Sequence, residues 1–196
     1  MGKRAKHRED RGAVLVEAIL VLPVLIILVL GIIEFGLVFA SSSTTTASSR
    51  SGARIAATAY PPSSGTTAQR ATADQIAAAV TADLTALSHA TPLGMTVYKV
   101  DPTSTSGAPV GGFPGDNMTG GCSSNCFKYT WNAGQNKLVY SSGGWSTPDA
   151  CGATVDSIGV FVQTSHEYVS DMFGSTRTVT GHTVMRLEPL PTDQCA

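Results

Sequence analysis

Four cysteines are the residues whose chemistry the sequence makes easiest to anticipate. If they lie outside the cytoplasm, their even number favours two disulfides, each worth about 2–4 kcal/mol of stability. Three pairings are possible, and the sequence does not choose among them. A zinc site is the alternative, but the first two cysteines are separated by three residues instead of the usual two, and no histidine lies nearby. We therefore expect disulfides among Cys122, Cys126, Cys151 and Cys195.

The other reactive side chains form no recognisable catalytic set. The four histidines are scattered along the chain: His7, His89, His166 and His182. His166 and Glu167 begin like a zinc-protease motif, but Ser170 stands where the second histidine would be needed. A nucleophile elbow, a phosphate loop and a dinucleotide fingerprint are all missing from the sequence. We expect no enzyme, metal or cofactor, and we expect His166 and His182 on the exposed surface of strands.

A carboxylate and a possible cleavage site lie close together near the N-terminus. Glu17 interrupts a long apolar run, where a charged carboxylate costs about 2–3 kcal/mol unless it is neutralised or shallow. If the chain were cut between Gly12 and Ala13, Ala13 would carry a new α-ammonium one helical turn from Glu17. Gly12 suits such a cut because it lets an extended backbone approach a protease. Glu17 then meets the ammonium of its own chain or of a neighbouring subunit, or it reaches the lipid headgroups.

Charge is distributed unevenly along the 196 residues. The chain has 13 basic and 14 acidic residues and a net charge of -1, which excludes a broadly basic nucleic-acid-binding protein. Residues 1–12 hold five basic and two acidic side chains, which gives this leader a net charge of +3. The remainder, with 8 basic and 12 acidic residues, has a net charge of -4.

Residues 13–40 are apolar enough to span a bilayer. The stretch Ala18 to Ile33 has 16 residues without a charge, and its apolar flanks extend it to the ~20 that a membrane-spanning helix needs. Pro23 removes a helical donor and predicts a kink. Basic residues directly before the segment predict an N-in, C-out orientation. We therefore expect a single-pass protein of the cytoplasmic membrane whose polar part lies outside the cytoplasm.

Residues 41–60 either extend this helix or form a linker. They are rich in Ser and Thr but contain no proline, and Ala47, Ile55 and Ala56 fall near one helical face. Prolines 61 and 62 predict a firm stop. We expect one helix from about Val14 to Ala59, and the alternative is a membrane helix that ends near Ala40 and is followed by a flexible linker.

Residues 61–196 are expected to form an α+β head. Apolar side chains at helical spacing predict an amphipathic helix over residues 68–87 that packs on a sheet. After residue 91 the pattern changes to period two, which predicts a small antiparallel sheet. The head has enough residues for one modest core but not for two. The expected strands are 95–100, 127–131, 138–140, 158–167 and 176–187.

The N-terminal pattern resembles a known family. Arg11 to Glu17, the apolar run to Pro23 and the segment Gly31 to Gly36 resemble the TadE-like pseudopilins, which are minor pilins of the tight-adherence (Tad) pilus in the type IV pilus superfamily. The resemblance covers roughly residues 8–60. Val184 to Pro189 resembles the closing strand of some members less closely, and the middle of the chain matches no family pattern.

This resemblance implies a structural function. A dedicated prepilin peptidase would cleave after Gly12, so that Ala13 becomes the first residue, and Glu17 would be the assembly carboxylate of the mature helix. The implied partners are the major pilin, a second pseudopilin, the inner-membrane assembly platform of the Tad system and a secretion ATPase. The protein would be extracellular once it is assembled in a pilus, and no nucleic acid is expected to bind.

Two other interpretations remain open. Val38-Phe39-Ala40 before Ser41 resembles a signal-peptidase site, which would give a secreted disulfide-bonded protein. The apolar run is, however, longer than the usual 7–15 residues of a signal peptide. The other interpretation is an uncleaved single-pass surface protein whose head binds a ligand. A lipoprotein is excluded because the first cysteine is Cys122.

Overall fold

The computed structural model describes residues 6–60, 65–145, 147–151, 155–170 and 174–191, with side chains from Gly12 onward. Two α-helices, a short 3-10 helix and five strands follow one another along the chain. Their bounds are α1 Lys6–Ala59, α2 Gly65–Leu84, β1 Ala90–Lys99, η1 Asp116–Met118, β2 Cys126–Asn132, β3 Lys137–Gly144, β4 Ser157–Glu167 and β5 Thr176–Arg186.

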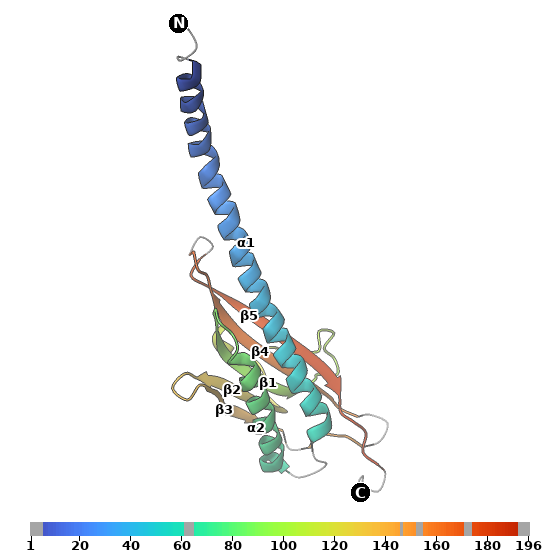
Figure 1. Cartoon of the computed structure of the whole chain (residues 1–196). Coiled ribbons are helices and arrows are strands. Elements are labelled where there is room, and N and C mark those ends of the chain that lie inside the picture. Colours follow the sequence, from blue (N-terminus) through green and yellow to red (C-terminus); the bar gives the residue numbers. More distant parts are fainter. Residues whose placement is uncertain (1–5, 61–64, 146, 152–154, 171–173, 192–196) are drawn as a thin grey trace.

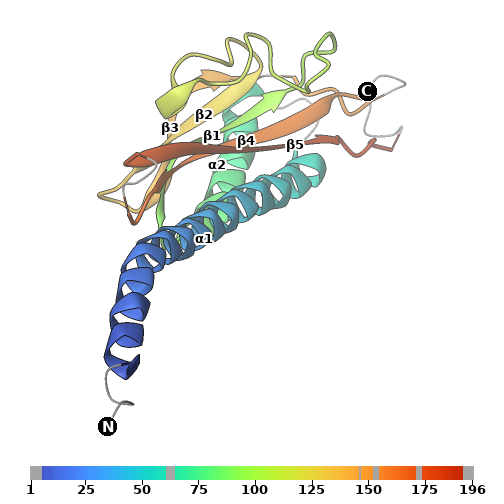
Figure 2. The same cartoon turned by 90° about the horizontal axis from the view of Figure 1, so that it is seen from above.

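The strands form one antiparallel sheet in the order β3-β2-β1-β4-β5. Both helices lie on the same face of this sheet, and α1 extends far beyond it toward the N-terminus (Figures 1 and 2). All five expected strands are present, which confirms an α+β head behind a long N-terminal helix. β1 begins five residues earlier than expected, at Ala90, and includes Pro92.

The long helix is continuous through the Ser- and Thr-rich segment, so the expected extension is confirmed and the flexible linker is not observed. Its 54 residues correspond to about 80 Å at 1.5 Å per residue. The helix is bent (Figure 2), in agreement with the kink expected from the internal Pro23. Pro23 lies in the part that extends beyond the sheet.

The face of α1 that packs on the head agrees only in part with the expected one, because Ala56 is buried in the main core and Ile55 packs against it, but Ala47 does not pack. Ala47 is exposed, and Ile55 is half-buried. The buried positions are instead small and mostly hydroxyl-bearing, at the helical spacing of three and four residues. They are Ser41, Thr45, Ser48, Ser49, Gly52, Ala53 and Ala56. Apolar periodicity therefore identified the helix and the packed side near its C-terminal end, but not the hydroxyl-bearing part of that side.

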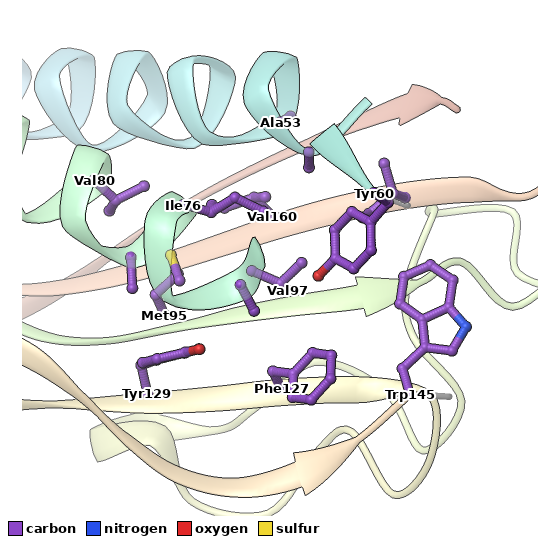
Figure 3. Packing of buried hydrophobic residues seen from close by; sticks show 14 of the residues in the cluster. Ala53, Tyr60, Ile76, Val80, Met95, Val97, Phe127, Tyr129, Trp145 and Val160 are labelled. Carbon is purple, nitrogen blue, oxygen red and sulfur yellow. The ribbon is translucent and has the colours of Figure 1, made fainter. Parts of the chain in front are cut away.

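The main hydrophobic core lies between the two helices and the sheet (Figure 3). Alternate side chains of β1 and β4 point toward the helices, as a strand with one face on a core requires. α2 contributes the apolar stripe that its spacing predicted, and the end of α1 closes the core beside an aromatic pair, Tyr60 and Trp145. The labelled members in Figure 3 include Ile76, Val80, Met95, Val97, Phe127, Tyr129 and Val160.

The opposite face of the sheet carries a second, smaller cluster, which corrects the expectation of a single core. The long loop after β1 crosses this face, and its Phe113 stacks on Phe161 with ring centroids 5.2 Å apart. Buried Gln163 holds the loop in place: its Oε1 accepts the Met118 N–H (2.8 Å) and its Nε2 donates to the Gly115 carbonyl (3.1 Å). A glycine- and proline-rich loop thus covers apolar surface that the sequence left unassigned.

Candidate functional site

The expected processing and assembly residues lie on the part of α1 that extends away from the head. Ala13 and Glu17 are exposed, and a Cβ built on Gly12 would meet no atom within 4 Å. Because α1 begins at Lys6, residues 12–17 already share one helical frame. Ala13 and Glu17 are therefore four residues apart on one face, about 6 Å along the axis.

Residues 12–33 form what we call the free segment, in which every residue is exposed except Leu30 and Gly31, which are half-buried where the segment approaches the head. It is about 32 Å long at 1.5 Å per residue, close to the ~30 Å hydrocarbon thickness of a bilayer. α1 is long and apolar enough to cross a membrane, and none of the residues in its most apolar stretch is buried. An exposed apolar surface of this extent marks a membrane or protein contact. Its large apolar side chains include Leu15, Ile19, Leu20, Leu22, Leu25, Leu28 and Ile32.

The head begins at what we call the neck, where α1 first contacts the end of β4. Glu34 is only 3% exposed, and its Oε1 accepts the backbone N–H of Ser170 at 2.5 Å. The next residue, Phe35, is 74% exposed. Glu34 is therefore the residue at which α1 begins to pack against the head.

Beyond the neck, α1 binds the sheet through a ladder of hydroxyl groups. Ser41 Oγ lies 3.0 Å from His166 Nδ1, and Thr45 Oγ1 lies 3.0 Å from Thr164 Oγ1. Ser41 and Thr45 are four residues apart on the helix, which corresponds to about 6 Å, and Thr164 and His166 are two residues apart on the strand, which corresponds to about 6.8 Å. Because these spacings are similar, each helix hydroxyl lies opposite one side chain of the strand. A further pair joins α1 to β5. Ser49 Oγ and Thr183 Oγ1 are 2.9 Å apart.

His166 corrects the expectation of an exposed strand histidine, because it is fully buried in this ladder. Its Nε2 has no hydrogen-bond partner within the described residues, and its ring lies edge-on to Tyr168 at 5.5 Å. The period-two series Ile158, Val160, Val162 points inward, and extending it four residues would have placed His166 on the same face. His182 is exposed, as expected, and packs beside Phe113 on the other side of the sheet.

The buried environment of His166 predicts that acid weakens the docking of α1. Burial lowers the pKa of His166 below its ordinary value of 6.5. The neighbouring charges act less strongly: Glu34 and Glu167 raise this pKa and His89 lowers it. Because the folded chain then binds fewer protons than the unfolded chain, its stability falls as the pH decreases below about 6.5 and stops falling below the lowered pKa.

The measurement is denaturant unfolding of the full chain in detergent at pH 7.5 and in steps down to pH 5. His166→Gln is expected to remove part of the acid destabilisation, whereas His182→Gln, the matched change at an exposed position, leaves it in place. An identical pH dependence in wild type and His166→Gln would contradict this assignment.

The cysteines are the remaining candidates from the sequence. Cys122 and Cys126 form a disulfide with their Cα atoms 6.1 Å apart. Cys151 is also disulfide-bonded, and Cys195 lies outside the described residues. Within the described ranges, no group of three or more metal-ligating side chains comes together. The geometry therefore directs attention to α1 and its neck.

The part of the chain that carries these features also matches a family model. The model of the family described as TadE-like protein matches residues 12–54, which confirms the expected resemblance for this segment. The match begins at Gly12 and ends within the docked part of α1, so it includes neither α2 nor the sheet. No curated protein and no solved structure has a significant match to the chain. The family and the candidate membrane helix support a membrane-associated component of a Tad pilus.

Proposed function

We propose that the chain is a minor pilin, or pseudopilin, of a Tad-type pilus. A prepilin peptidase removes residues 1–12 on the cytoplasmic side, so that Ala13 becomes the first residue of the mature protein. Residues 13–40 then serve as the membrane and assembly helix, residues 41–60 continue it into the head, and residues 61–196 complete the head outside the cytoplasm. Its partners are other pilins, a second pseudopilin and the inner-membrane platform of the Tad system.

One observation carries this proposal: one continuous helix is apolar and exposed over its first half, among the described residues, and is part of the folded head over its second half. Such a helix can leave a bilayer and enter a bundle of similar helices without any change in the head, since both environments satisfy its apolar surface. The lone carboxylate in the free segment, Glu17, is then the group that distinguishes one subunit contact from another.

The docked part of α1 argues against secretion after cleavage at Ala40. Ser41 is buried and contacts His166, and it lies in the interior of a continuous helix. A cut before Ser41 would place a charged α-ammonium beside this buried histidine. It would also remove Glu34 and its contact with Ser170 from the head. The expected costs are several kcal/mol for a buried unpaired charge.

The cysteines fit a head that folds outside the cytoplasm. Since Cys122 pairs with Cys126, the remaining cysteine available to Cys151 is Cys195, and we propose this second bridge. The Leu190 N–H donates to the Ala150 carbonyl (2.9 Å), which brings the C-terminal segment beside Cys151. The second bridge would tie the C-terminus to the head.

The N-terminal residue of the protein recovered from cells tests the proposal. We expect Ala13, and we expect Gly12→Leu to abolish processing, because a branched side chain replaces the residue that lets the protease approach. Mass spectrometry of the purified chain distinguishes the mature form from the precursor. Gly36→Leu is a matched control, since Gly36 also has no atom within 4 Å of a built Cβ. A start at Ser41 would indicate secretion, and an intact leader in wild type would indicate an uncleaved surface protein.

A further inference from the structure

A pocket of about 440 Å³ lies at the neck, between α1 and the start of β5. Its volume is within the range of small-ligand sites. It combines two opposite charges, Glu34 and Arg177, with an apolar and aromatic wall. The wall consists of Gly31, Phe35, Val38 and Tyr168.

Glu34 offers this pocket a hydrogen-bond acceptor. Its Oε1 accepts the Ser170 N–H, and the Ser170 hydroxyl and the Val169 N–H also lie near the carboxylate. Its Oε2 is buried and makes no hydrogen bond within the described residues. A buried carboxylate oxygen without a donor is unfavourable, and native proteins rarely leave one unsatisfied. A cationic donor from outside the described residues would give this oxygen the hydrogen bond that it does not make within them.

Arg177 offers the same pocket a group for an anion. It is exposed, and it takes part in no ion pair within the part of the chain that the structure describes. The planar guanidinium binds phosphate through two parallel hydrogen bonds. A ligand that carries both a phosphate and an ammonium would satisfy both ends of the pocket.

The depth of the pocket indicates where such a ligand comes from. Under the proposed function, the free segment spans the hydrocarbon layer, since its length of about 32 Å matches the thickness of that layer. On α1 the pocket extends from Gly31 to Val38, across the end of the free segment, so it lies where the helix passes from the hydrocarbon layer to the lipid headgroups. The exposed aromatic rings of Phe35 and Phe39 beside it provide apolar surface at the same level.

We propose that the neck pocket binds the headgroup of a phospholipid that carries a primary ammonium. The ammonium donates to Glu34 Oε2, the phosphate accepts from Arg177, and the apolar wall faces the glycerol end of the lipid. This inference rests on the membrane span in the proposed function. Binding would fix the depth and rotation of the head at the membrane surface before the subunit is assembled.

The test uses the full chain in nanodiscs that contain equal amounts of phosphatidylethanolamine, phosphatidylcholine and phosphatidylglycerol. Native mass spectrometry after partial delipidation reports which lipid remains bound. Phosphatidylcholine has a phosphate and a cation but no ammonium proton, and phosphatidylglycerol has no ammonium. We expect phosphatidylethanolamine to be retained roughly tenfold over both, the factor expected for one charge-assisted hydrogen bond.

Two variants separate the two ends of the pocket. Glu34→Gln keeps an acceptor for Ser170 and is expected to remove the preference for phosphatidylethanolamine. Arg177→Gln is expected to lower the retention of all three lipids. Arg50→Gln, the loss of another exposed arginine outside the pocket, should change neither.

Equal retention of the three lipids by wild type, or a preference that Glu34→Gln leaves unchanged, would overturn the lipid site while leaving the membrane span intact. A photo-crosslinker at Val38 distinguishes lipid from protein. Crosslinking to a second protein chain instead of lipid would assign the pocket to a subunit contact and also overturn the proposal. A chain that does not insert into the nanodisc would contradict the span itself, and the lipid site with it.

Discussion

Glu17→Ala is expected to leave the protein cleaved and in the membrane but to reduce its incorporation into pili by at least about tenfold. The reason is the charge that cleavage creates. The structure places Ala13 and Glu17 on one face of a continuous helix, so the new α-ammonium and the carboxylate lie close together or face the same neighbouring subunit. Removing one partner of a buried ion pair costs about 3–5 kcal/mol. A tenfold loss corresponds to only about 1.4 kcal/mol, so tenfold is the smallest reduction that we expect.

The measurement is the amount of the chain in sheared pilus fractions relative to the membrane fraction. Glu17→Gln keeps the shape and loses the charge, so it should fail in the same way as Glu17→Ala. Val16→Ala removes apolar volume from the neighbouring exposed position and should assemble nearly normally. Normal incorporation of Glu17→Gln would show that the charge has no function in assembly. Accumulation of precursor would show instead that Glu17 acts in cleavage.

Most of the fold could be predicted because its signals are local. The free segment is a long apolar run, α2 shows its apolar stripe at helical spacing, and the five strands alternate with period two. The patterns of α2 and of the strands reflect which side of one element faces the core, and the apolar run of the free segment reflects a helix without a polar side. The TadE-like resemblance likewise depends on a local pattern, and the matched segment lies entirely within α1.

The docked half of α1 could not be predicted in the same way, because its contact with the sheet is polar. Ser41 and Thr45 satisfy their hydroxyl groups against His166 and Thr164, more than a hundred residues away in the sequence. Apolar periodicity gives no weight to such residues. Of the three positions that it indicated, Ala47 is exposed, whereas Ile55 and Ala56 pack on the core near the end of the helix. His166 is buried for the same reason, because the helix residue that covers it, Ser41, is also distant in the sequence.

The loop after β1 illustrates a second limit. Its composition is that of an exposed loop, yet Phe113 and Met118 cover apolar side chains on the outer face of the sheet. Covering that face depends on Gln163, whose amide holds the loop through two backbone groups. A buried glutamine in the middle of a strand has no signal in the sequence, because its partners lie about 45 residues earlier in the chain.

The hydroxyl contacts require α1 and β5 to lie close together, so a side chain added between them is expected to have a large effect. Gly181 of β5 faces α1, and a Cβ built there would lie 2.9 Å from the Thr45 carbonyl oxygen and 3.0 Å from the Thr46 Cα. These are backbone atoms, which cannot rotate away as a side chain can, so Gly181→Val must push α1 off β5 and separate the hydroxyl pairs. We expect a loss of about 1–3 kcal/mol in the free energy of unfolding. Faster amide hydrogen exchange over residues 41–56 should accompany it.

Thr180→Val, an exposed position on the same strand, is the control. Unchanged exchange over residues 41–56 in Gly181→Val would mean that the head folds without a docked α1, and that the helix is a linker after all.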